Sequence, residues 1–136
     1  MDADEMRRRF ASASLARLGS VRPDGRPHLV PICFTLDGDT IVSAVDDKPK
    51  RTMQLRRLDN VRAYPAVSLL VDHYDDDWTQ LWWVRVDGTA RVLEAGTARA
   101  RAIDLLAAKY AQYRALRPEG PVLEIAVEAW RGWSAR

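Results

Sequence analysis

Turn signals recur at short intervals along this chain, and they constrain its fold more than any other feature. Two turns that contain Asp-Gly, at residues 23–25 and 37–39, separate short segments. The flanking segments 15–21, 28–36 and 40–45 are rich in apolar and β-branched residues, as the strands of hairpins are. The first third of the chain is therefore predicted to form three successive antiparallel strands.

The rest of the chain continues this pattern and adds helices. Periodicity and turn residues predict further strands at 67–71, at 81–92 with an interruption near Gly88, and at 122–130, and helices at 4–13, from Met53 to just before Asn60, and at 97–116. This order predicts one domain over residues 1–136. Its fold class is mainly β, predominantly antiparallel, with the sheet curled into a barrel and helices flanking it. A doubly wound parallel sheet is excluded.

Charge and cysteine content limit the partners and the compartment. The formal net charge is +2, which is too small a bias to favour nucleic acid or an anionic membrane as the main partner. The single cysteine, Cys33, excludes an intrachain disulfide framework. Since the sequence also contains neither a secretory signal pattern nor an apolar run of about 20 residues, we expect a cytoplasmic protein.

A basic segment at the start of the second predicted helix is the strongest local chemical feature. Backbone N–H groups at a helix start attract anions, and neighbouring cations add charge-assisted hydrogen bonds. The segment contains Lys48, Lys50, Arg51 and Thr52, and Arg56 and Arg57 follow it. It is either a phosphate site, extended along a polyanionic ligand, or a solvated basic helix surface.

No other polar pattern predicts a metal site or a covalent catalyst. Three consecutive carboxylates at 75–77 rarely converge on one ion and are more typical of a solvated turn. His28 and His73 lie far apart in the sequence without other ligands at metal-binding spacing. No serine has the glycine context of a nucleophile elbow. We therefore predict no metal and assign no catalytic residue.

Five tryptophans are many for a chain of this length. Adjacent residues of a strand face opposite sides of a sheet, so Trp82 and Trp83 are predicted to lie one inside the barrel and one on an outer face. An outward tryptophan suits either a dimer interface or stacking against a planar cofactor. Both hold if the cofactor sits at the interface.

Several motifs together resemble one family, the flavin-binding split barrels, also called the pyridoxamine phosphate oxidase-like family. The resemblance rests on residues 20–28 with Pro31, on 50–52, on 60–61 and on 67–71. Residues 46–52, 71–78 and 81–88 are similar more narrowly to the coenzyme F420-dependent branch of actinobacteria. The resemblance covers nearly the whole chain and implies an FMN-binding split β-barrel fold.

The resemblance also implies a homodimer whose two cofactor sites lie at the interface, each using both chains. The third strand and the following loop line the cofactor in such proteins, the basic helix start holds phosphate, the fourth strand contributes a small polar residue, and the last strand ends in an Arg or Trp near the ring. The corresponding residues here are Ser43, Ala44, Val45, Lys48, Lys50, Arg51, Thr52, Ser68, Arg131 and Trp133.

The implied chemistry is hydride transfer between a reduced deazaflavin, coenzyme F420, and a small unsaturated organic substrate. One alternative keeps the fold and uses FMN, whose phosphate also suits Lys50 and Arg51. A second is a non-catalytic protein that binds flavin, deazaflavin or haem. A third, an oligonucleotide-binding barrel with stacking tryptophans, is disfavoured because the acidic segment 72–77 would repel phosphate.

Overall fold

A computed structural model describes residues 1–45 and 51–135 of the chain, with the backbone alone for residues 51–55. The elements are α1 (Ala3–Ser12), β1 (Ala16–Val21), β2 (Pro27–Ile32), β3 (Thr35–Asp37), β4 (Thr40–Ala44), α2 (Arg51–Ala63), β5 (Ala66–His73), the 3-10 helix η1 (Trp78–Gln80), β6 (Trp82–Leu93), α3 (Thr97–Lys109), α4 (Ala111–Ala115) and β7 (Val122–Ser134).

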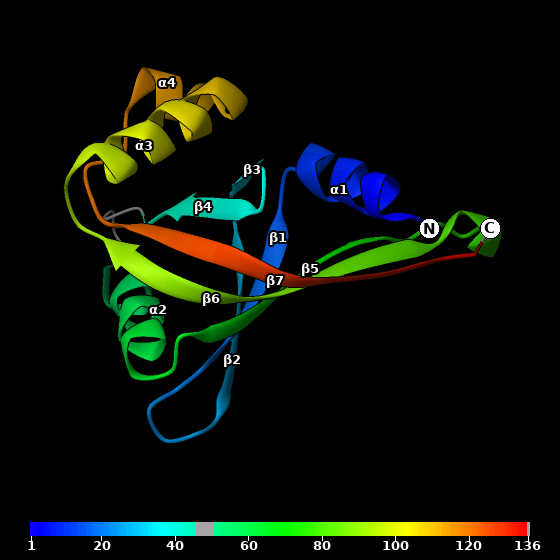
Figure 1. Cartoon of the computed structure of the whole chain (residues 1–136), viewed down its shortest axis with the longest axis horizontal. Coiled ribbons are helices and arrows are strands. Elements are labelled where there is room, and N and C mark those ends of the chain that lie inside the picture. The colour runs from blue at the N-terminus through cyan, green and yellow to red at the C-terminus, as the bar shows by residue number, and fades with distance from the viewer. Residues whose placement is uncertain (46–50, 136) are drawn as a thin grey trace.

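The strands form one seven-stranded sheet in the order β2-β1-β5-β6-β7-β4-β3. Each neighbouring pair is antiparallel, and helices flank the sheet, so the predicted fold class is confirmed. The long β6–β7 ribbon crosses the molecule, with α2 near one end and both chain termini near the other (Figure 1). Helices α3 and α4 lie together beyond β4 (Figure 1).

The single strand predicted at 28–36 is wrong, because the chain divides there into β2 and β3. Strand β2 pairs with β1 at one edge of the sheet, and β3 pairs with β4 at the other edge. Residues 33 and 34 therefore carry the chain from one edge to the other. Neither ladder satisfies the backbone at this crossing, so other partners are needed there.

Side chains from the end of α3 supply those partners. The Tyr110 hydroxyl accepts a hydrogen bond from the Phe34 N–H at 3.0 Å and lies 3.0 Å from the Phe34 carbonyl and 2.9 Å from the Ser14 carbonyl. The Lys109 ammonium donates to the carbonyls of Ala13 at 2.7 Å and Phe34 at 2.9 Å. These bonds tie the crossing to α3 and to the segment between α1 and β1.

The helix predicted at 97–116 is also divided, into α3 and α4. Tyr110 between them has an extended backbone with φ −115° and ψ 121°. This break is where the Tyr110 side chain bonds to the crossing at Phe34. The apolar periodicity of the segment predicts one continuous helix, because periodicity does not record a tertiary hydrogen bond that interrupts a helix.

Two apolar clusters hold the fold together. Inside the curled sheet, Phe10 of α1 is fully buried and contacts Phe34 and Trp130, with ring centroids 4.9 Å and 5.5 Å away. The second cluster packs Ile103 and Leu106 of α3 against Val42 of β4 and Val122 of β7. Helix α1 therefore covers one end of the barrel core, and α3 covers β4 from outside.

Strand β6 continues through the predicted interruption near Gly88. The β6–β7 register shifts between Asp87 and Gly88, so the irregularity is a bulge and not a strand end. A Cβ at Gly88 would collide with the Ala126 carbonyl oxygen, which explains the glycine. Within the described part of the chain, we found no helix with the length and apolarity needed to cross a bilayer.

The crossing predicts a large stability effect at Lys109. Replacing Lys109 by Met should lower the free energy of unfolding by about 2–3 kcal/mol, because partly buried carbonyls lose charge-assisted hydrogen bonds. Urea unfolding measures the change. The matched control is Arg91→Met, which breaks an exposed ion pair with Glu124 and should cost less than about 1 kcal/mol. Equal effects of the two variants would contradict the account of the crossing.

Tyr110 predicts a loss of stability at alkaline pH. Burial raises the pKa of Tyr110 from 10.0 to about 12, mainly because the charged form is desolvated. The unfolded chain therefore releases this proton first, so stability is lost as pH rises from about 10 towards 12. Urea unfolding at several pH values should show a steeper alkaline decline for the wild type than for Tyr110→Phe. Parallel declines would disprove the assignment.

Candidate functional site

The outer face of the sheet presents a regular array of side chains across five strands. The cross-strand register aligns Pro31, Arg17, Leu70, Arg85 and Arg131 in one row. The neighbouring row contains Leu29, Gly19, Ser68, Asp87 and Ala129. Because side chains alternate along a strand, both rows face away from the barrel core.

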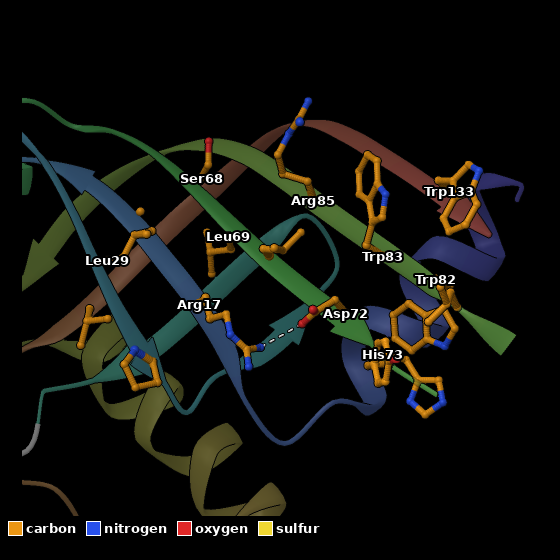
Figure 2. Close-up of a pocket in the computed structure, with 16 residues that line it drawn as sticks. Arg17, Leu29, Ser68, Leu69, Asp72, His73, Trp82, Trp83, Arg85 and Trp133 are labelled. Carbon is orange, nitrogen blue, oxygen red and sulfur yellow. Dashed lines mark hydrogen bonds and ion pairs between the residues drawn. The ribbon is translucent and has the colours of Figure 1, made fainter. Parts of the chain in front are cut away.

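An open groove with a volume of about 790 Å³ runs along this face. The groove contains more apolar than polar lining groups, and its size lies within the range of small-molecule sites. Leu29, Trp83, Arg85 and Trp133 are among the side chains that line it (Figure 2). Leu29 is 77% exposed and Trp133 47% exposed, which is unusual for large apolar side chains on one face.

The groove also contains hydrogen-bonded polar groups. The Ser68 hydroxyl donates to Asp87 Oδ1 at 2.7 Å, and Arg85 Nε lies 3.5 Å from the same oxygen. Arg17 pairs with Asp72 at 3.0 Å, as the dashed line in Figure 2 marks. Asp87 and Asp72 are therefore both paired with an arginine, while the Ser68 oxygen keeps its capacity to accept a hydrogen bond.

The two adjacent tryptophans of β6 divide as predicted. Trp82 packs against the barrel core, stacks on His73 with centroids 6.0 Å apart, and lies under the Arg9 guanidinium of α1 at 5.0 Å. Trp83 belongs to the outer face, where Arg85 lies 5.8 Å from its ring. Trp133 is directly opposite Trp83 in the β6–β7 ladder. Trp83 and Trp133 are thus neighbours on adjacent strands, and they form an aromatic pair at one end of the groove.

Three of the predicted site residues lie on this outer face. Ser68 and Trp133 line the groove. Arg131 is exposed and is the cross-strand partner of Arg85. Its guanidinium donates a hydrogen bond to the Trp130 carbonyl at 2.9 Å. These three residues come from β5 and β7, which β6 separates, and the sheet brings them onto one surface.

The predicted residues of β4 and its end lie elsewhere. Ser43 is fully buried and donates to the Cys33 carbonyl at 2.7 Å. Ala44 packs beneath α3, and Val45 belongs to the barrel core. Strand β4 is covered on both faces, which buries these side chains within the chain. A cofactor contact by Ser43, Ala44 or Val45 stays a prediction.

The predicted phosphate anchor falls partly outside the described residues. Lys48 and Lys50 lie in the segment 46–50, which is not described. Arg51 and Thr52 are the first two residues of α2, so the predicted helix does begin at the end of the basic segment. The role of these four residues in holding phosphate stays a prediction.

The acidic loop organises itself through local hydrogen bonds. Asp75 Oδ1 accepts from the Asp77 N–H at 2.7 Å, and Asp77 caps η1 by accepting from the Thr79 hydroxyl and N–H. These bonds from Thr79 lower the pKa of Asp77. Across residues 1–45 and 51–135, no group of three or more His, Cys, Asp or Glu side chains is arranged to hold a metal ion.

Sequence reasoning missed most of the groove. Arg17 and Leu29 come from strands that were predicted, and Asp72 directly follows the strand predicted at 67–71. Their convergence depends on the sheet order, with β5 inserted beside β1. Part of the signal was available, since the alternation in 81–92 already places Trp83, Arg85 and Asp87 on one face. Register between strands distant in sequence was not available from periodicity.

Comparison with known proteins identifies the family. The sequence matches the family described as pyridoxamine 5'-phosphate oxidase over residues 3–134. The chain belongs to the pyridoxamine 5'-phosphate oxidase family. The match covers both the groove-lining strands and the crossing between β2 and β3. A search among curated proteins found no significant match.

Solved structures share the fold of this pyridoxamine 5'-phosphate oxidase family member at low sequence identity. A conserved hypothetical protein from Mycobacterium tuberculosis is 21% identical with a TM-score of 0.78, over 100% of this chain and 86% of that chain. An FAD-binding protein from Mesorhizobium loti is 20% identical with a TM-score of 0.72, over 97% and 94%. The haem storage protein HutZ from Vibrio cholerae is 14% identical with a TM-score of 0.70, over 96% and 90%.

Proposed function

We propose that this protein is an oxidoreductase that transfers a hydride between reduced coenzyme F420 and a small unsaturated organic substrate. The outer groove carries the proposal, because it combines sufficient volume with an aromatic pair and a few fixed polar groups. Family membership supports a flavin-type cofactor, and the motif resemblance in segments 71–78 and 81–88 supports the deazaflavin branch. A cytoplasmic location is part of the proposal.

The groove residues fit a planar, partly polar ring system. Trp83 and Trp133 offer ring surfaces, and Leu29 offers an exposed apolar contact on the opposite side of the array. Ser68 is oriented by Asp87 and can accept or donate a hydrogen bond to the ring edge. The bound deazaflavin would supply the hydride chemistry, while these side chains bind it, orient it and exclude water.

We place the second copy of the chain on the same face. An isolated chain would leave Leu29, Trp83 and Trp133 on an open surface, whereas a partner sheet packed over the groove would cover them. A two-fold interface uses the same patch on both subunits. The proposed homodimer thus forms two equivalent cofactor sites, each closed by the opposite chain.

Titration of the purified protein with coenzyme F420 and with FMN tests the cofactor. Saturable quenching of tryptophan fluorescence by F420 at micromolar concentration, with FMN at least about tenfold weaker, is the expected result. Trp133→Ala should weaken binding about fivefold to 150-fold, since stacking contributes about 1–3 kcal/mol. The matched control Trp78→Phe removes a tryptophan that is exposed outside the groove and should leave affinity unchanged.

The titration also separates the alternatives. Preference for FMN would assign the protein to an FMN-dependent oxidase or reductase of the same family. Tight binding without hydride transfer to any of a panel of unsaturated substrates would favour a cofactor-binding protein, and a haem titration belongs in the same series because one structural neighbour is a haem storage protein. Binding of none of the three cofactors would overturn the proposed function.

The proposed dimer predicts a selective effect of charge at Leu29. Leu29→Glu should convert the dimer to a monomer in sedimentation velocity, because an unpaired carboxylate would be buried at the interface. Leu116→Glu is the matched control, since Leu116 is also an exposed leucine but lies outside the groove. A monomeric wild type, or dissociation by both variants alike, would refute this interface.

A further inference from the structure

A second polar site lies on the opposite side of the β1–β2 hairpin, beneath α2. Asn60 of α2 donates from Nδ2 to Ser20 Oγ of β1 at 3.1 Å, and both residues are buried. Ser20 is directly opposite His28 in the β1–β2 ladder, so both side chains point to the face that α2 covers. This hydrogen bond therefore fixes α2 beside His28.

Three arginines share this location. Arg57 lies three residues before Asn60, so it occupies the same face of α2, and Arg56 is its neighbour. Arg22 follows Ser20 by two residues at the end of β1, where its N–H donates to the Arg26 carbonyl across the turn. The charges of Arg57, Arg22 and Arg56 act on His28 and, after burial, lower its pKa.

Two nitrogen atoms in this cluster lack a partner among the described residues. His28 Nδ1 and Arg57 Nε are buried, and neither makes a hydrogen bond to the part of the chain that the structure describes. Buried polar atoms are rarely left unsatisfied, so such a pair indicates a missing ligand. Within the described residues, no carboxylate is among the groups that shift the pKa of His28. Asp24 pairs with Arg22 at 3.4 Å in the exposed turn, and Tyr113 acts on Arg57.

We propose that His28, Arg57 and Arg22, with Arg56, form a binding site for a phosphate or carboxylate group. Arginine is well suited to such an oxyanion because its N–H donors match two acceptor oxygens. A protonated His28 donates from both ring nitrogens, so the bound anion stabilises the imidazolium. The site therefore takes up a proton with its anion, and affinity falls as pH rises through the titration of His28.

The proposed anion site does not depend on which cofactor binds in the outer groove. The anion is either a free phosphate or the phosphate or carboxylate tail of a larger ligand that reaches past the hairpin. In the second case the site deepens the proposed function, since a polyanionic tail distinguishes F420 from FMN. The same arginine and histidine donors would bind either a free phosphate or the anionic tail of a larger ligand. Titrations of the variants with phosphate and with F420 distinguish these two anions.

The chain contains only two histidines, which makes nuclear magnetic resonance of the imidazoles a direct test. The pKa of His28 should rise when inorganic phosphate, tripolyphosphate or triglutamate is added, while the imidazole signals of His73, which lies at the C-terminal end of β5, stay unchanged. His28→Gln assigns the two signals. No response of His28 to any of the three probes would overturn the proposal.

Arginine variants measure the contribution of the cluster. Arg57→Gln should weaken phosphate binding about tenfold, the loss expected for one charge-assisted contact. Arg101→Gln, which breaks an exposed ion pair with Asp37, is the matched control and should have no effect. If Arg57→Gln does not fold, Arg22→Gln serves in its place, and a change in the pH dependence of phosphate binding between the wild type and His28→Gln tests the proton coupling. Unchanged affinity in the arginine variant that folds would contradict the site.

A cofactor titration of the same variants identifies the source of the anion. Equal losses of phosphate and F420 affinity in Arg57→Gln would assign the anion to the cofactor tail. A response to phosphate with unchanged F420 affinity would assign a separate phosphate site. Failure of F420 to bind the wild type, with His28 still responding to phosphate, would remove the proposed function and leave this site in place.

Discussion

The hydrogen bonds of Lys109 and Tyr110 to Phe34 hold the chain where it crosses from one edge of the sheet to the other. At Phe34 the chain leaves one edge of the sheet and joins the other, and the backbone there has no ladder partner. Side chains from the end of α3 provide the bonds that a neighbouring strand would otherwise make. Because the edges are tied together in this way, the inner face closes around Phe10, and the outer face of β1, β2 and β5–β7 stays open as a groove.

The fold class could be predicted because alternation and turn residues act locally. The Asp-Gly turns were predicted where the structure turns from β1 to β2 and from β3 to β4. The alternation of 81–92 predicted opposite faces for Trp82 and Trp83, of which Trp82 lies towards the core and Trp83 on the outer face. Both divided elements, at Phe34 and at Tyr110, were missed for the same reason. The backbone N–H of Phe34, at the first break, donates a hydrogen bond to the hydroxyl of Tyr110, at the second break. The two residues are 76 positions apart in the sequence, so no local pattern predicts this bond.

The candidate site was less accessible to sequence reasoning than the fold. Ser68 and Trp133 were placed by resemblance, and both line the groove. The same resemblance predicts a cofactor contact for Ser43, and this contact stays a prediction. The sheet order places β4 between the core and α3, where the Ser43 hydroxyl donates to the Cys33 carbonyl. Alternation along β2 has a further consequence: Leu29 faces the groove, and its neighbour His28 faces the cationic cluster under α2. One hairpin therefore contributes to an apolar site on one face and an anionic-ligand site on the other.

Hydrogen–deuterium exchange, followed along the sequence with and without saturating cofactor, tests most directly whether the outer groove is the binding site. The cofactor used is whichever of F420 and FMN binds more tightly. If the cofactor binds in the outer groove, new protection is expected in β2 (Pro27–Ile32) and in the part of β7 that carries Arg131 and Trp133, with α3 (Thr97–Lys109) unchanged. Protection confined to α3 and α4, with β2 and β7 exchanging as in the free protein, would contradict it.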